Sequence, residues 1–311
     1  MGYIVKKKVQ FFIDDVIWLF RDLTRQRPVS MFDHPFLGAL KTAHEEYGVK
    51  TQLNVFYRTS FFYGDDDFSL SEMTDAYKAE WVASSDWLKL AFHSKEEFPD
   101  YPYVNADYNL VKNNFNLIVN QIRRFAGNSS IAWAIVPHWA PISKEGVLAL
   151  RDCGVKVTYA TWGEKIPYDG DASSLPYGHA NRLLHNKKPE TCLFTRSTYD
   201  KAITRSICGY NHLSSEQYQK INQTCDTYQD PETGMHFNNS AHLVLNLCNT
   251  ETITNDLNKL IGQEYINIGN HEQYFYPDYF AYQPDYAEKI FTMGRMLHEA
   301  GYEFIFMEDL A

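Results

Sequence analysis

Two adjacent aspartates, Asp14 and Asp15, follow the apolar stretch at residues 9–13, and apolar residues resume directly after them. Two carboxylates side by side at the edge of a hydrophobic segment repel each other, so they must be solvated, paired with positive groups or bound to a cation. A single aspartate at a strand end is commonly a helix cap or a turn former. The pair therefore raises the question of whether it holds a cation or exchanges protons.

Acids and histidines also follow later apolar runs. His93 ends the run at 87–93 with Glu97 four residues on, and His271 ends the run at 265–271. A divalent metal such as zinc takes imidazole and carboxylate ligands and keeps one position open for water. The bound water loses a proton near neutral pH, a nearby carboxylate accepts it, and a histidine protonates the leaving group. Asp15, His93 and Glu97 together would make such a His/carboxylate site.

Apolar strand-like runs alternate with helical stretches over most of the 311 residues. Strands are expected at 9–13, 50–57, 87–93, 131–139, 155–161, 242–247, 265–271 and 303–310. Helices are expected at 36–48, 69–85, 108–127, 144–154, 250–262 and 284–301. Such alternation predicts a mostly parallel sheet covered by helices, and this number of strands favours a closed or nearly closed β/α barrel. In that fold the active site lies at the C-terminal ends of the strands, where the acids and histidines occur.

The stretch 163–241 interrupts this alternation. It is rich in Gly, Asn, Ser, Thr and Tyr, with short strand candidates at 191–196 and 204–210. Its apolar content is too thin for a core of its own. We therefore interpret it as an insertion on one face of a single domain that spans residues 1–311.

Composition excludes several classes of function. The net charge of −10 argues against nucleic acid as a partner. No run approaches the roughly 18 apolar residues of a membrane span. Residues 1–15 lack the pattern of a signal peptide. None of the expected strands is followed by a glycine motif that binds nucleotides. Five widely spaced cysteines without a CxxC pair favour reduced thiols in a cytoplasmic protein. The oligomeric state is not predicted.

The order of these motifs resembles that of the polysaccharide deacetylases of carbohydrate esterase family 4, the NodB-homology fold. The shared features are an aspartate pair after the first strand, a His-containing motif after the third, a Pro-aromatic loop after the fourth and a histidine near the end. The resemblance implies a distorted (β/α)7 barrel that hydrolyses acetyl groups on a sugar with a metal ion. It assigns Asp14 as catalytic base and His271 as general acid, and it assigns Asp15 and His93 as metal ligands.

The sequence departs from the family pattern at two positions. Where the family has a second histidine in His-x-x-x-His, this chain has Glu97, which we assign as the third metal ligand. The family's third motif carries an arginine, which "AIVPHWAPIS" lacks, and His138 lies close to its place. We therefore assign His138 as a catalytic residue that orients the substrate or polarises its carbonyl.

The sequence thus predicts a deacetylase that acts on an acetylated carbohydrate with one divalent ion, zinc being the favoured ion. Residues expected to bind the substrate are Tyr57, Arg58, Trp139 and Glu272. Two alternatives stay open. One is a barrel that binds carbohydrate without catalysis. The other is a glycosidase, which needs two carboxylates roughly 5–10 Å apart, such as Asp14 with Glu272 or Glu164.

Overall fold

The computed structural model describes most of the chain outside its irregular middle. The described residues are 7–59, 67–97, 102–103, 106–140, 142–159, 214, 216–217, 220–221, 227–238, 241–279 and 281–311. The strand candidates at 191–196 and 204–210, and Glu164, lie outside them. No helix within the described ranges is long and apolar enough to cross a membrane.

The centre of the fold is a six-stranded parallel sheet in the order β3-β2-β1-β9-β8, with β10 also pairing with β1. Its strands are β1 (Lys7–Val16), β2 (Thr51–Phe56), β3 (Leu88–Ser94), β8 (Leu243–Val244), β9 (Tyr265–His271) and β10 (Tyr302–Ile305). Along one edge of β1, the first residues pair with β10 and the later residues pair with β2. Strand β9 pairs with the opposite edge of β1. The long strand β1 is therefore the axis of the sheet and carries both aspartates at its end.

A second sheet, in the order β4-β5-β7-β6, continues the first. Its strands are β4 (Ala134–Ile135), β5 (Val157–Tyr159), β6 (Tyr228–Gln229) and β7 (His236–Asn238). A parallel bridge between Leu90 and Ile131 joins its edge to β3. The ring of Phe12 on β1 meets Tyr159 on β5, their centroids 5.6 Å apart, so the combined sheet curves back on itself. The predicted parallel α/β architecture is confirmed, although the described strands do not close into a continuous ladder between β7 and β8.

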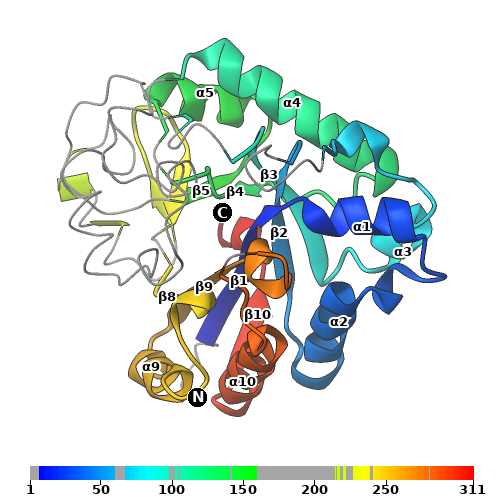
Figure 1. Cartoon of the computed structure of the whole chain (residues 1–311). Coiled ribbons are helices and arrows are strands. Elements are labelled where there is room, and N and C mark those ends of the chain that lie inside the picture. Colours follow the sequence, from blue (N-terminus) through cyan, green and yellow to red (C-terminus); the bar gives the residue numbers. More distant parts are fainter. Residues whose placement is uncertain are drawn as a thin grey trace.

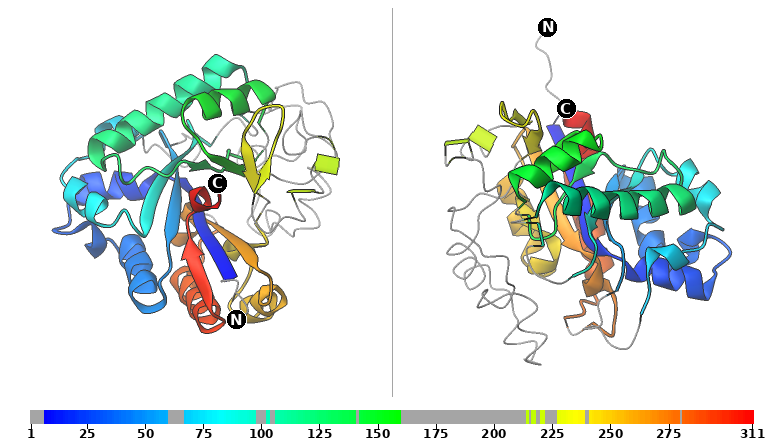
Figure 2. Two further views of the ribbon diagram at one scale, coloured as in Figure 1. Left: turned by 180° about the vertical axis from the view of Figure 1, so that it is seen from behind. Right: turned by 90° about the horizontal axis from the view of Figure 1, so that it is seen from above.

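The helices lie around the outside of the strands (Figure 1). They are α1 (Trp18–Gln26), α2 (Pro35–Tyr47), α3 (Lys78–Ala83), α4 (Tyr108–Phe125), α5 (Lys144–Asp152), α9 (Ile253–Leu260) and α10 (Tyr286–Glu299). Helix α4 packs against α5 along one side, and α10 packs against α2 and α9 on another. The view from above in Figure 2 shows these helices flanking the curved sheet.

One predicted helix is wrong. In place of a helix over 69–85, a 3-10 turn at Leu70–Glu72 and the short α3 are separated by an irregular segment. The capping box is present, since the Glu72 carboxylate accepts from the Ser69 amide at 2.8 Å. The backbone then leaves the helical region at Met73, whose side chain is buried. Tertiary packing of Met73 thus overrides the local helical preference.

Strand ends were the other source of error. The strand expected at 131–139 is confined to β4, and the one expected at 303–310 ends at Ile305 and continues as a 3-10 turn, Met307–Leu310. Within that turn Glu308 pairs with Lys89 of β3 and accepts from the backbone amide of Trp133. Within the predicted insertion, β7 pairs with β5, so the insertion contributes a strand to the sheet.

The inner face of the sheet has its own small core, formed around Phe12, Val136, Val157 and Tyr159. Gly269 of β9 lies opposite Phe12 in the parallel register. A Cβ atom at position 269 would stand 2.8 Å from Cζ of Phe12, closer than van der Waals contact permits. The glycine therefore makes room for the aromatic ring directly beneath the aspartate pair.

We predict that Gly269→Ala lowers the free energy of unfolding by about 1–3 kcal/mol, because the added methyl group overpacks the ring of Phe12. Urea denaturation measures this change. The double variant Gly269→Ala/Phe12→Leu should recover part of the loss, since the smaller side chain vacates the contact. A double variant no more stable than the sum of the two single losses would contradict the proposed clash.

Candidate metal centre and active site

The end of β1 is irregular where the two aspartates lie. The pairing with β2 shifts register between Ile13 and Val16, and Asp15 has a φ of 65°, in the left-handed region that aspartate tolerates better than most residues. In a regular strand, neighbouring side chains would point to opposite faces. Here both buried carboxylates reach groups of the site instead, Asp14 contacting Asn54 and Asp15 contacting His93.

Two buried histidines have their tautomers fixed by backbone carbonyls. His93, on β3, donates from Nδ1 to the carbonyl of Val136 at 2.6 Å. His138, in the loop after β4, donates from Nε2 to the carbonyl of Glu97 at 2.9 Å. In neutral rings, the lone pairs are then left on His93 Nε2 and His138 Nδ1, which lie 3.1 Å apart.

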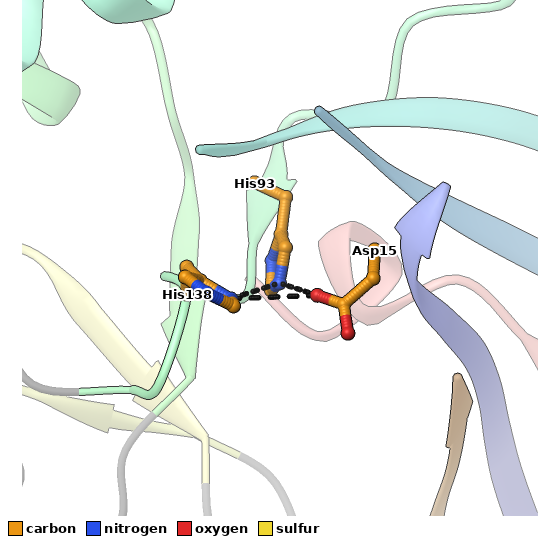
Figure 3. A group of neighbouring side chains, drawn as sticks. All are labelled: Asp15, His93 and His138. Carbon is orange, nitrogen blue, oxygen red and sulfur yellow. Dashed lines mark hydrogen bonds and ion pairs between the residues drawn. The ribbon is translucent and has the colours of Figure 1, made fainter. Parts of the chain in front are cut away.

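These two nitrogens and one carboxylate oxygen form a compact triangle (Figure 3). Asp15 Oδ1 lies 3.1 Å from His93 Nε2 and 3.4 Å from His138 Nδ1. Ligand atoms 2.0–2.1 Å from a tetrahedral zinc ion are roughly 3.3 Å apart, close to all three edges. Three converging electron-pair donors, each buried, fit a divalent cation of the zinc type by both spacing and chemistry.

The pKa shifts of Asp15 and His138 also indicate that this triangle favours a positive charge. Burial disfavours the ionised form of Asp15, but hydrogen bonds from His138 and His93 outweigh it and hold the pKa of Asp15 well below its usual value. Burial also opposes a charged His138, yet the hydrogen bond to Asp15 and the nearby carboxylate of Glu97 raise its pKa to about 9. A proton on His138 therefore fills the role that a metal ion would take over.

Asp14 and His271 lie side by side at the ends of β1 and β9, where they are partners in the parallel register. Burial raises the pKa of Asp14, although the charges of His93 and His271 oppose the rise. Its Oδ1 accepts from Nδ2 of Asn54 at 2.6 Å. His271 Nδ1 pairs with Oδ1 of Asn246 at 2.8 Å, which leaves Nε2 for proton exchange.

Glu97 lies behind the triangle as seen from Asp15. Its side chain is buried, and Oε1 is 3.8 Å from His138 Nε2, the nitrogen turned away from Asp15. Nε2 of Gln273 approaches the other carboxylate oxygen at 3.5 Å. The group of ligand atoms that converges in the described residues contains His138 and not Glu97. The sequence predicted Glu97 as the third metal ligand and His138 as a catalytic residue, whereas the donor atoms that converge with Asp15 and His93 are those of His138.

The residues expected to bind substrate occupy two kinds of position. Half-buried Tyr57 and exposed Arg58 directly follow β2, where the Arg58 guanidinium makes a two-point ion pair with Glu96 at 2.6 and 3.0 Å. Trp139 follows His138 with a φ of 62°, and its ring contacts that imidazole at 5.8 Å between centroids. All three residues lie in the segments that follow β2 and β4, and Trp139 is the one whose side chain contacts a residue of the triangle.

Glu272 is placed differently. Its carboxylate is fully buried and accepts from the backbone amides of Ile17, Trp18 and Leu19 at 2.7–2.9 Å. Tyr276 donates to it as well, at 3.2 Å. These are the unpaired amides at the start of α1, so Glu272 acts as a cap supplied from a segment about 250 residues away in sequence. With its oxygens occupied in this way, it takes no part in the site that we propose.

Two polar residues near the site were not predicted. Asn54 of β2 holds Asp14, and Asn246 holds His271. A signal for Asn54 existed in the sequence, since Gln52 and Asn54 alternate with apolar residues in β2 and therefore share one face. Asn246 offered none, because it lies in a 3-10 turn, Leu245–Leu247, where the sequence predicted the second half of a strand over 242–247.

Comparison with known proteins finds likeness in structure only. No family model matches the chain, and no curated protein matches it. Solved carbohydrate esterases and peptidoglycan deacetylases are among the structures that it resembles. The Xyl-CE4 domain of a multidomain xylanase from the hindgut metagenome of Trinervitermes trinervoides is 12% identical, with a TM-score of 0.41 over 98% of this chain and 89% of that one.

Two further solved structures show how identity, TM-score and coverage vary among the matches. A family 4 acetyl xylan esterase from Clostridium thermocellum is 13% identical, with a TM-score of 0.42 over 98% of this chain and 90% of that one. The 4-alpha-glucanotransferase from Thermococcus litoralis is 8% identical with a TM-score of 0.52, and the match covers 98% of this chain but 40% of that one. At such identities the likeness concerns the fold alone.

The cap at Glu272 leads to a prediction about pH. Burial raises the pKa of Glu272 to about 7, although the three amides favour its ionised form, whereas the reference value is 4.5. Between these values the folded chain holds a proton that the unfolded chain has released, so stability falls as pH rises. From pH 5 to pH 8 the wild type should lose about 2–3 kcal/mol more than Glu272→Gln in urea denaturation.

The comparison with Glu272→Gln cancels contributions from all other titrating groups. Equal pH dependence of the two proteins would show that Glu272 stays ionised in its buried position. A third variant, Glu272→Ala, should be less stable than Glu272→Gln at both pH values, because it leaves the amides at the start of α1 without an acceptor.

Proposed function

We propose that this chain is a metal-dependent hydrolase that removes an acetyl group from an acetylated carbohydrate. The triangle of Asp15 Oδ1, His93 Nε2 and His138 Nδ1 is the observation that carries the proposal. In a buried space, three electron-pair donors within 3.4 Å of one another call for a cation. The resemblance of the motif order to the polysaccharide deacetylases supplies the proposed substrate class.

The proposed ligands are Asp15, His93 and His138, with zinc as the favoured ion. When bound, such an ion lowers the pKa of a water ligand toward neutrality and polarises an acyl oxygen. The carbonyls of Val136 and Glu97 keep each imidazole turned so that its free nitrogen faces Asp15. Partners of this kind, bonded to the second nitrogen of a ligating histidine, fix the ring and raise its basicity.

Asp14 is the proposed general base. Its raised pKa makes it a better proton acceptor than an ordinary aspartate, and it lies next to the ligand Asp15. His271 is the proposed general acid that gives a proton from Nε2 to the leaving amine or alcohol of the sugar. Asn246 supports this role because it holds the ring through Nδ1. Tyr57, Arg58 and Trp139 are the proposed contacts for the sugar.

Metal analysis of the purified protein tests the ligand set. We expect about one divalent ion per chain in the wild type and loss of the ion in Asp15→Ala, His93→Ala and His138→Ala, because each removes one of the few ligands. Glu97→Gln is the matched control, since it is isosteric and buried beside the same histidine. It should keep the stoichiometry of the wild type. A wild type without a divalent ion would overturn the metal centre, and loss of the ion in Glu97→Gln alone would make Glu97 the ligand.

Acetate release tests the reaction. The wild type should release acetate from N-acetylated chitooligosaccharides or acetylated xylan, and Asp14→Asn should lower kcat by about 10²–10⁴-fold while it keeps the metal. His271→Gln should do the same if it provides the acid. Reducing ends without acetate would identify a glycosidase instead. Sugar binding that withstands chelators, without either product, would identify a non-catalytic barrel.

A further inference from the structure

A chain of hydrogen bonds runs through the inside of the sheet to Asp14. Gln52 donates from Nε2 to the carbonyl of Ala134 at 3.1 Å and to Oδ1 of Asn54 at 2.7 Å. Asn54 in turn donates from Nδ2 to Oδ1 of Asp14 at 2.6 Å. Both amide side chains are fully buried, and they share a face because they lie two residues apart on β2.

This chain has a direction. Asn54 Oδ1 is engaged by the Gln52 amide group, so the donor end of Asn54 must face Asp14. In turn, Gln52 is anchored to β4 by the carbonyl of Ala134. An ionised acceptor in a dry interior makes a strong hydrogen bond. The Asp14 carboxylate is therefore held from the β2 side by a donor whose orientation is already set.

Asp14 needs such a restraint because of its neighbours. It is adjacent in sequence to the proposed ligand Asp15, and its Oδ1 lies 3.8 Å from the imidazole of another proposed ligand, His93, at the Nδ1 that donates to Val136. A divalent ion attracts any carboxylate that can reach it. A second carboxylate on the ion would offset the charge of the ion and weaken its effect on a water ligand. Asp14 would then also be unable to accept the proton as general base.

We propose that Asn54, oriented by Gln52, is a positioning residue that keeps the Asp14 carboxylate from becoming an additional ligand of the metal centre. This inference rests on the proposed function. According to this inference, the two neighbouring aspartates have different roles because only Asp14 accepts the hydrogen bond from Asn54. Asp15 meets two imidazoles, and Asp14 meets an amide.

The rival explanation is that this chain of hydrogen bonds serves packing alone, since it ties β2 to β4 and pairs the buried NH2 groups of Gln52 and Asn54. Cutting it would then destabilise the fold and leave the metal centre unchanged. Asn238→Leu provides a matched control for this effect. Asn238 is another buried asparagine of the sheet interior, on β7, where Oδ1 accepts from the hydroxyl of Tyr265 at 2.9 Å.

The experiment uses the full chain loaded with Co²⁺, whose visible absorption weakens and shifts when a further ligand joins the ion. Four proteins are compared: the wild type, Asn54→Leu, Asn54→Leu/Asp14→Asn and Asn238→Leu. We expect a weaker, shifted band in Asn54→Leu and the wild-type band in both other variants. If Asn54→Leu does not fold, Asn54→Ser replaces it, because its hydroxyl is too short to reach Asp14.

The double variant is the decisive comparison. Restoration of the wild-type band when Asp14 loses its charge shows that the added ligand was Asp14. An Asn54→Leu band identical to that of the wild type overturns the inference, and so does a changed band that Asp14→Asn fails to restore. A wild type that binds no Co²⁺ overturns the proposed metal centre itself, and this inference with it.

Discussion

The candidate site depends on one constraint: electron pairs that converge in a buried space require a positive charge between them. His93 and His138 each have one nitrogen committed to a backbone carbonyl, so their free nitrogens and Asp15 face a common point. Without a cation, the buried carboxylate of Asp15 lies within 3.4 Å of two imidazole lone pairs and has no positive charge to offset its burial. The raised pKa of His138 is consistent with this constraint, because a proton on His138 supplies the positive charge.

The irregular end of β1 determines whether Asp15 faces the two histidines. The left-handed Asp15 and the register shift turn a second carboxylate toward the histidines, and α1 begins three residues later. Glu272 then fixes the start of α1 by accepting its first amides. Since Glu272 directly follows β9, the strand that presents His271 also holds the turn that presents Asp15. The two sides of the site are therefore positioned by one another.

The sequence predicted much of this arrangement because strand ends can be recognised from apolar runs. Asp14, Asp15, His93 and His271 all end such runs, and the parallel sheet brings the ends together. The positions of Glu97 and His138 could not be predicted in the same way. Both lie in loops, where no periodicity reports the direction of a side chain. The helix expected at 69–85 failed for a related reason, because the burial of Met73 is decided by tertiary packing.

The proposal of His138 as a ligand in place of the predicted Glu97 has a simple chemical interpretation. The motif pattern that this chain resembles supplies its second imidazole four residues after His93, and this chain has a carboxylate there. A carboxylate ligand at that point would have placed two negative groups on one ion and weakened its effect on a water ligand. His138 instead reaches the same triangle from the next strand end, and the chain provides one carboxylate and two imidazoles as proposed ligands. In the proposed centre, the donor atoms and their spacing therefore matter more than the sequence positions that supply them.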